Sequence, residues 1–260
     1  MDLSNPVAGF GVGLLVGLTG VGGGALMTPI LVLLFGVAPA AAVGTDLWFA
    51  ACTKMAGGAM HHNKGSVDWE VMRRLCLGSL PSSVLTLSWL HLSGGSQVKG
   101  GLILQALGAV LLLTALAMVL KRRSQAYGQS LRMRAAERFK KSQPMLTVVA
   151  GAVLGFLVTL TSVGAGALGT VMLVYLYPFR MKGARLVGTD IVHAIPLTII
   201  AGTGHMLMGN VDLDLLGKLL VGSVPGVLIG SHFSNKAPEA VLRAVIATLL
   251  AIVGGKLLLA

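Results

Sequence analysis

The sequence predicts an all-α polytopic membrane protein that is an inverted repeat, in which each half holds one broken or re-entrant helix and three transmembrane helices. Three observations predict this fold class. The 260 residues are 55% hydrophobic and only 11% charged, with a mean hydropathy of +0.84, whereas soluble domains have about 25% charged residues. Eight long apolar segments follow one another along the chain. A glycine-rich motif in the first segment returns in the fifth.

The polar residues divide the apolar segments into two groups of four. These segments lie at 7–35, 38–62, 69–92, 97–120, 145–177, 184–208, 213–233 and 239–260. The intervening stretch has eight basic residues and one acidic residue, Glu137. We therefore expect a first transmembrane repeat at 1–120, a basic cytoplasmic linker at 121–143 and a second transmembrane repeat at 144–260. Its charge suits the linker to lie on anionic headgroups as a partly helical segment.

The two groups of segments match each other in sequence. Residues 19–28 read TGVGGGALMT, and residues 161–170 read TSVGAGALGT. Shorter matches follow in the same order: VGTD occurs at 43–46 and 187–190, and GSLP at 78–81 corresponds to GSVP at 222–225. This is an internal duplication, which is a common plan in secondary transporters.

The first and fifth segments are too long to be single membrane helices. They have 29 and 33 residues, and 29 helical residues would measure about 43 Å against a hydrocarbon core of about 30 Å. Each glycine inside a helix also costs about 1 kcal/mol relative to alanine. We therefore expect both helices to break at the glycines into two arms of about 18–20 Å each, with new helices beginning near Ala25 and Ala167. The alternative is that the small residues only allow tight helix packing.

The distribution of the 20 Lys and Arg residues favours an inverted arrangement. If 7–35 and 145–177 are re-entrant hairpins, 16 basic residues lie on the face of the linker and three lie on the opposite face. If all eight segments span the membrane, the division is 13 to 6, with Lys54 internal in both cases. The positive-inside rule prefers the first division. Three spans in each half then make the two repeats inverted and the linker cytoplasmic.

The two breaks predict an anion site at the centre of the bilayer. A helix that begins after a break presents free N–H groups and the positive end of its dipole, and two such ends facing each other suit an anion. The predicted substrate-binding residues are Thr19, Gly22, Gly23, Gly24, Thr45, Lys54, Ser162, Gly164, Ala165, Gly166 and Thr189.

Four charged or titratable residues lie inside the predicted membrane segments. Lys54 is interpreted as an anion contact or a coupling group, and the alternative is an ion pair with Asp46. Asp46 and Asp190 follow Gly-Thr in both halves, so each is either a coupling carboxylate or a helix cap. His193 lies one turn after Asp190, which suits a proton relay. The alternative for His193 is a hydrogen bond to the backbone.

Three more polar residues near the ends of segments have structural interpretations. Asp68 and Asp212 precede apolar segments at matching positions, and we expect them to cap the helices that follow. His205 precedes a loop, and we expect it to lie at the membrane interface.

The motifs resemble those of the TauE/SafE sulfite exporter family. The carrying residues are GLTGVGGGALMTP at 17–29, AVGT at 42–45 and GSVD at 65–68, and the weaker second copy extends the resemblance over 7–260. The resemblance implies a membrane transporter for small sulfur-containing anions, such as sulfite or the sulfonate sulfoacetate. In the second copy Ala165 replaces Gly23 and Val171 replaces Pro29, so the two half-sites are not equivalent.

The resemblance implies export across the bacterial inner membrane by alternating access, with a small anion and the lipid bilayer as partners. Proton coupling and a homodimer are further options. The alternatives are an anion channel of the same fold, an importer of a sulfur oxyanion, or a subunit that only supports a partner. We expect no enzymatic activity, cofactor, metal or nucleic acid, because no catalytic or metal-binding spacing occurs and the basic residues form no aromatic-interleaved patch.

Overall fold

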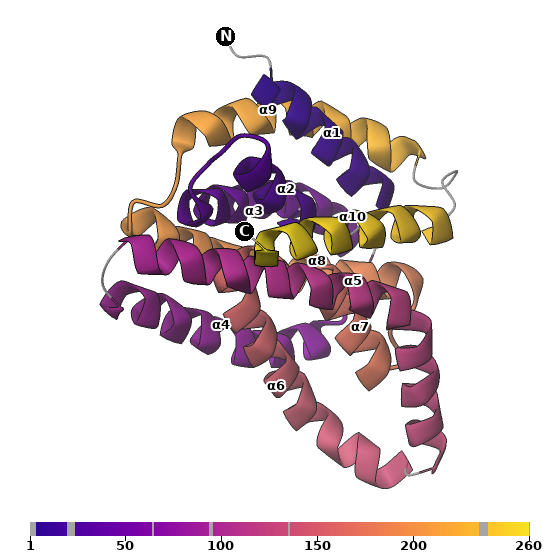
Figure 1. Ribbon diagram of the computed structural model, residues 1–260. Coiled ribbons are helices and arrows are strands. Elements are labelled where there is room, and N and C mark those ends of the chain that lie inside the picture. Colours follow the sequence, from indigo (N-terminus) through magenta and orange to yellow (C-terminus); the bar gives the residue numbers. More distant parts are fainter. Residues whose placement is uncertain are drawn as a thin grey trace.

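The chain forms an all-helical bundle (Figure 1). The computed structural model describes residues 4–19, 24–63, 65–93, 96–134, 136–233 and 239–259. Its helices are α1 (Ser4–Thr19), α2 (Gly24–Leu33), α3 (Pro39–Asn63), α4 (Trp69–Leu92), α5 (Ser96–Arg134), α6 (Ala136–Thr161), α7 (Ala167–Leu176), α8 (Gly183–Leu207), α9 (Leu213–Phe233) and α10 (Glu239–Leu259). Five of them, α4, α5, α6, α8 and α9, contain described stretches that are long and apolar enough to cross a membrane. The all-helical, multi-pass part of the predicted fold class is therefore confirmed, and the inverted orientation of the repeats stays a prediction.

The second glycine motif interrupts a helix at the predicted point, and residues 20–23 of the first motif lie outside the described residues. Helix α1 ends at Thr19 and α2 begins at Gly24, and α6 ends at Thr161 and α7 begins at Ala167. The prediction of arms of equal length is wrong. The arms have 16 and 10 residues in the first half and 26 and 10 in the second, or about 24 and 15 Å and about 39 and 15 Å.

The extra length of α6 comes from the basic linker. Helix α5 continues through 121–134 and α6 begins at Ala136, so the linker is helical throughout its described residues. Lys, Arg and Gln are good helix formers. A helix that has begun in the apolar segment can therefore continue through these polar residues. The end of α5 and the start of α6 project together from the rest of the bundle (Figure 1).

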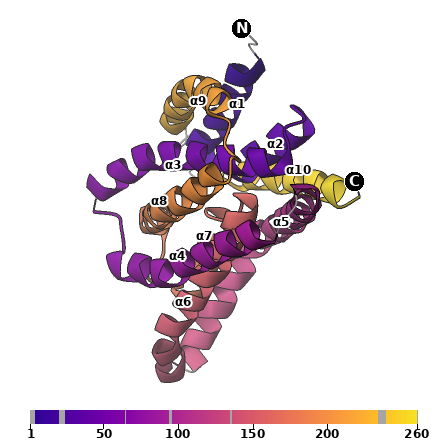
Figure 2. The same ribbon diagram turned by 90° about the vertical axis from the view of Figure 1, so that its left-hand side faces the viewer.

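Helices of the first half of the chain pack mainly against helices of the second half. Helices α3 and α8 lie side by side in the middle layer, between the pair α1 and α9 on one side and the pair α4 and α6 on the other (Figure 2). The principal neighbour of α1 is therefore a helix from the second half, and the principal neighbour of α6 is one from the first half. This arrangement places α3 and α8 at the centre of the molecule.

Glycines outside the breaks bring these helix pairs close together. A Cβ atom at Gly78 of α4 would lie 1.9 Å from the backbone oxygen of Val148 in α6, and a Cβ atom at Gly222 of α9 would lie 1.8 Å from that of Pro6 in α1. Small residues permit such backbone contact between membrane helices. Tight packing is thus the role of glycines at these two matching positions, whereas the motif glycines lie at interrupted helices.

Candidate functional site

The second break is a buried stretch of irregular backbone. All residues from 161 to 170 are buried. Ser162 has φ of 59°, and Gly164 and Gly166 have φ of 123° and 130°, conformations that favour glycine. The Thr161 hydroxyl accepts a hydrogen bond from the Val163 N–H at 3.2 Å. Non-helical backbone at membrane depth requires such enclosure, because lipid cannot satisfy its polar groups.

The first break is described only at its edges. Gly22 and Gly23 lie outside the described residues, and Thr19 and Gly24 are the terminal residues of α1 and α2. One turn into α2, the Thr28 hydroxyl donates a hydrogen bond of 2.5 Å to Oδ2 of Asp46 on α3. A carboxylate of the first half therefore lies against the first turns of the helix that follows the first break.

Helix α3 connects the two breaks. The Lys54 ammonium, only 5% exposed, donates a hydrogen bond of 3.2 Å to the backbone oxygen of Ala165. The ammonium interacts electrostatically with Asp190 and Asp46. The Ser162 hydroxyl lies close to the Asp46 carboxylate, without the geometry of a good hydrogen bond. Predicted residues from α3 and from the second break are thus brought together.

The Asp190 carboxylate lies at the start of α7. A Cβ atom at Gly169 would be 2.2 Å from Asp190 Oδ1, and the carboxylate interacts with the backbone N–H of Gly166, the residue that precedes α7. A negative charge is stabilised at the N-terminus of a helix. Asp190 therefore occupies a position suited to an anionic ligand.

His193 lies one turn after Asp190 on α8, and its hydrogen-bond partner is not one of the predicted proton-relay residues. Its Nε2 and the Oγ of Ser79 on α4 are hydrogen-bonded at 2.9 Å, with both residues buried. The prediction of a coupling role for His193 is not tested by this contact. Ser79 was not among the predicted site residues, although the repeated Gly-Ser-x-Pro sequence at 78–81 and 222–225 is a signal for it.

Several polar atoms of the predicted residues are buried without a hydrogen-bond partner among the described residues. They are Asp46 Oδ1, Ser162 Oγ, Asp190 Oδ1 and His193 Nδ1. Buried polar atoms in native proteins are nearly always paired. These atoms belong to α3, α8 and the second break, and they are free to bind a ligand or a proton.

Thr45 and Thr189 hold the two halves together by equivalent contacts. The Thr45 hydroxyl accepts the backbone N–H of Asp212 at 3.0 Å, and the Thr189 hydroxyl accepts that of Asp68 at 2.9 Å. The Asp68 carboxylate in turn accepts a hydrogen bond from the backbone N–H of Val71 at 3.3 Å, and the Asp212 carboxylate accepts one from that of Leu215 at 2.9 Å. The predicted capping roles of Asp68 and Asp212 are confirmed.

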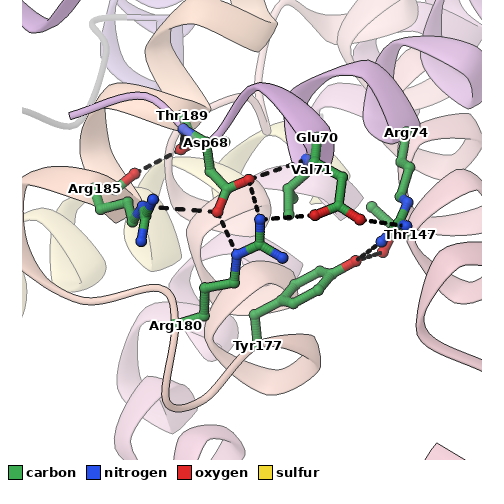
Figure 3. Close-up of polar contacts among 9 residues, drawn as sticks. All are labelled: Asp68, Glu70, Val71, Arg74, Thr147, Tyr177, Arg180, Arg185 and Thr189. Atoms are coloured by element: carbon green, nitrogen blue, oxygen red, sulfur yellow. Dashed lines mark hydrogen bonds and ion pairs between the residues drawn. The ribbon is translucent and has the colours of Figure 1, made fainter. Parts of the chain in front are cut away.

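An ion-pair network on one side of the bundle was not predicted (Figure 3). Arg180, in the loop between α7 and α8, donates to Asp68 from Nε at 2.5 Å and from Nη2 at 2.7 Å, and Nη2 also donates to Glu70 at 2.8 Å. Arg185 lies 3.7 Å from the Asp68 carboxylate. Partial burial lowers the pKa of the Arg180 guanidinium, and its bonds to Glu70 and Asp68 raise it, with a net rise above its ordinary value. The sequence predicts only that these arginines help to orient the chain in the membrane by their positive charge.

The predicted position of His205 at the membrane interface is not tested by its contacts. Its side chain is fully buried, and Nε2 is hydrogen-bonded to the backbone oxygen of Thr159 at 2.9 Å. Its burial follows from the packing of α8 against α3, α4, α6 and α7.

The site has a buried lysine and two buried aspartates beside interrupted apolar helices. This combination is typical of polytopic membrane transporters. The family described as Sulfite exporter TauE/SafE matches residues 6–257. The chain is 40% identical to "Probable membrane transporter protein YjnA" of Bacillus subtilis, over 99% of this chain and 100% of that protein. It is 28% identical to "Probable membrane transporter protein YdhB" of the same organism, over 94% and 95%. No solved structure gives a significant match.

The chain therefore belongs to the TauE/SafE sulfite exporter family. It is a multi-pass membrane transporter and not an enzyme.

Proposed function

We propose that this transporter exports small sulfur-containing anions, either sulfite or a two-carbon sulfonate such as sulfoacetate, across the bacterial inner membrane. The name of the family supports the substrate class. The observation that carries the proposal is the placement of the Asp190 carboxylate at the N-terminus of α7, beside Gly166. A substrate anion has the chemistry to replace that carboxylate at the helix N-terminus.

The charges of the site indicate how the anion enters. When it is ionised, the Asp190 carboxylate places a negative charge at the N-terminus of α7, and the cations Lys54 and Lys121 both interact with it electrostatically. An incoming anion is repelled by an ionised Asp190 carboxylate at this position, and the repulsion is strong away from water. Protonation of one carboxyl group removes the repulsion and frees the N-terminus of α7. We therefore propose that a proton binds together with the anion, with Asp190 as the acceptor and His193 on the proton path.

The membrane potential gives a direction to this coupled movement of the anion and the proton. A divalent anion that leaves with one proton carries one negative charge outward, which an inside-negative potential favours by about 2.3 kcal/mol per 100 mV. A monovalent anion with one proton is electroneutral, and a proton gradient directed inward then drives uptake. The same carboxylates thus make an importer of a sulfur oxyanion the second candidate.

Alternating access requires each side to close in turn. On the linker side the Asp68–Arg180 pair joins the start of α4 to the loop before α8. We propose that this pair closes the cytoplasmic side in one state of the transport cycle and separates in the other. A homodimer is not needed for this cycle, because both breaks come from one chain.

Transport by the purified protein in liposomes tests the proposal. Radiolabelled sulfite, sulfoacetate and sulfate are offered on one side while an internal dye reports pH. We expect saturable movement of sulfite or sulfoacetate with counterflow, accompanied by protons. Asp190→Asn is expected to move the anion without protons, because the amide neither repels an anion nor titrates.

Asp214→Asn is the matched control, because Asp214 is an exposed carboxylate that pairs with Lys218 in α9. We expect this variant to transport anions and protons as the wild type does. Ohmic single-channel currents would indicate a channel instead of a carrier. Proton movement unchanged in Asp190→Asn would exclude Asp190 as the coupling residue, and failure of all three anions would overturn the substrate class.

A further inference from the structure

A pocket of about 250 Å³ opens on the linker side of the molecule, apart from the broken-helix site. Its walls come from α4, α5, α6 and the loop between α7 and α8. The side chains that decide its chemistry are Glu70, Arg74, Arg132, Lys140, Tyr177 and Arg180.

The lining of the pocket is strongly basic. Four cations face one carboxylate, so its formal charge is +3. The carboxylate of Glu70 is already paired with Arg74 at 2.6 Å and with Arg180 at 2.8 Å. Arg132 and Lys140 make no hydrogen bond or ion pair with any residue whose side chain the structure describes. Two cations of the pocket are therefore uncompensated within the described part of the chain.

One wall of the pocket is held in place by its own contacts. The Tyr177 hydroxyl accepts a hydrogen bond from Arg74 at 3.3 Å and is hydrogen-bonded to Thr147 at 2.8 Å. Arg180 lies over the Tyr177 ring, 6.0 Å from its centre. Arg132, in contrast, comes from α5 and is half-buried. Its guanidinium presents a planar set of donors that fits the oxygens of a tetrahedral anion.

We propose that this pocket binds a tetrahedral oxyanion, with Arg132 and Lys140 as its principal ligands. The chemistry fits the phosphate of an anionic lipid headgroup and also a free phosphate or sulfonate. Basic pockets between membrane helices on the cytoplasmic side suit anionic headgroups. Phe179, also in the lining and 54% exposed, provides an apolar surface at which the rest of a lipid can pack.

Native mass spectrometry of the delipidated full-length protein tests the site. The protein is titrated with phosphatidylglycerol, with phosphatidylcholine and with inorganic phosphate. The test variant is Arg132→Gln combined with Lys140→Gln. The matched control is Arg122→Gln combined with Arg123→Gln. These two arginines are exposed on α5, the helix of Arg132, and do not line the pocket. The control variant loses the same two positive charges as the test variant.

We expect one bound oxyanion per chain, weakened at least tenfold in the test variant and unchanged in the control. A preference for phosphatidylglycerol over phosphatidylcholine identifies a lipid headgroup as the source. Binding of inorganic phosphate with no preference between the lipids identifies a free oxyanion. Equal losses in both variants, or binding that persists in the test variant, would overturn the proposal. Matching thermal unfolding of the two variants excludes misfolding as the cause of a loss.

Discussion

At the scale of single residues, Asp68 and Asp212 show how two matching positions acquire different roles. Both carboxylates cap a helix and both backbone N–H groups bind a threonine of the other half. Asp68 is nearly fully buried, with 2% of its side chain exposed, and is paired with Arg180, whereas Asp212 is exposed. The repeated sequence predicts the caps, and the burial that gives Asp68 its ion pair depends on a loop more than 100 residues away.

Replacing each of these aspartates by asparagine separates capping from ion pairing. Asparagine caps a helix about as well as aspartate, so only the charge is lost. We expect Asp68→Asn to destabilise the protein by about 1.5–3 kcal/mol, the range for hydrogen bonds to charged groups. Asp212→Asn should change stability by less than about 0.5 kcal/mol, as exposed substitutions usually do.

Thermal unfolding in detergent at low and high salt measures both effects. The cost of Asp68→Asn should fall as salt screens the wild-type pair, whose arginine is 39% exposed. Equal melting temperatures for the two variants would show that the Asp68–Arg180 pair contributes no stability.

At the scale of elements, the helix breaks were predictable because their causes are local. Glycine clusters inside segments that exceed one span indicate an interruption, and α7 begins at the expected residue, Ala167. The lengths of the arms were not predictable from hydropathy, because polar linker residues extend α5 and α6 without any membrane signal. The site shares this limit. Lys54 was identified by its position in an apolar segment, whereas Ser79 as the partner of His193 depends on the packing of α4 against α8.

The close contacts between helix pairs give a prediction for the two repeats together. Gly78→Ala and Gly222→Ala should each destabilise the protein by about 1–3 kcal/mol, because a methyl group at either position meets backbone that cannot easily move. Gly217→Ala, also in α9, has open space around it and should stabilise the protein by up to about 1 kcal/mol.

Melting temperatures of the three glycine variants test this packing. Similar losses for Gly78→Ala and Gly222→Ala would show that the α4–α6 and α1–α9 contacts are equally tight. A loss at Gly217 as large as at the other two would contradict the described packing.

At the scale of the whole molecule, inverted repeats, if the prediction holds, place equivalent positions on opposite sides of the membrane. Arg73 in α4 and Gly217 in α9 are equivalent and both are exposed. In a background with Cys52→Ala and Cys76→Ala, we expect Arg73→Cys to react with an impermeant maleimide only from the cytoplasm. Gly217→Cys should react only from outside. Labelling of both from one side would mean that the repeats are parallel.

The pairing of α1 with α9 has a consequence for synthesis of the protein. About 190 residues separate the end of α1 from the start of α9, so α1 must persist in the membrane without its principal neighbour while those residues are synthesised. A chain that stops after α5 contains α1 without α9 and α4 without α6. We therefore expect that neither half folds alone, and that two fragments from a divided gene fold only when both are produced together.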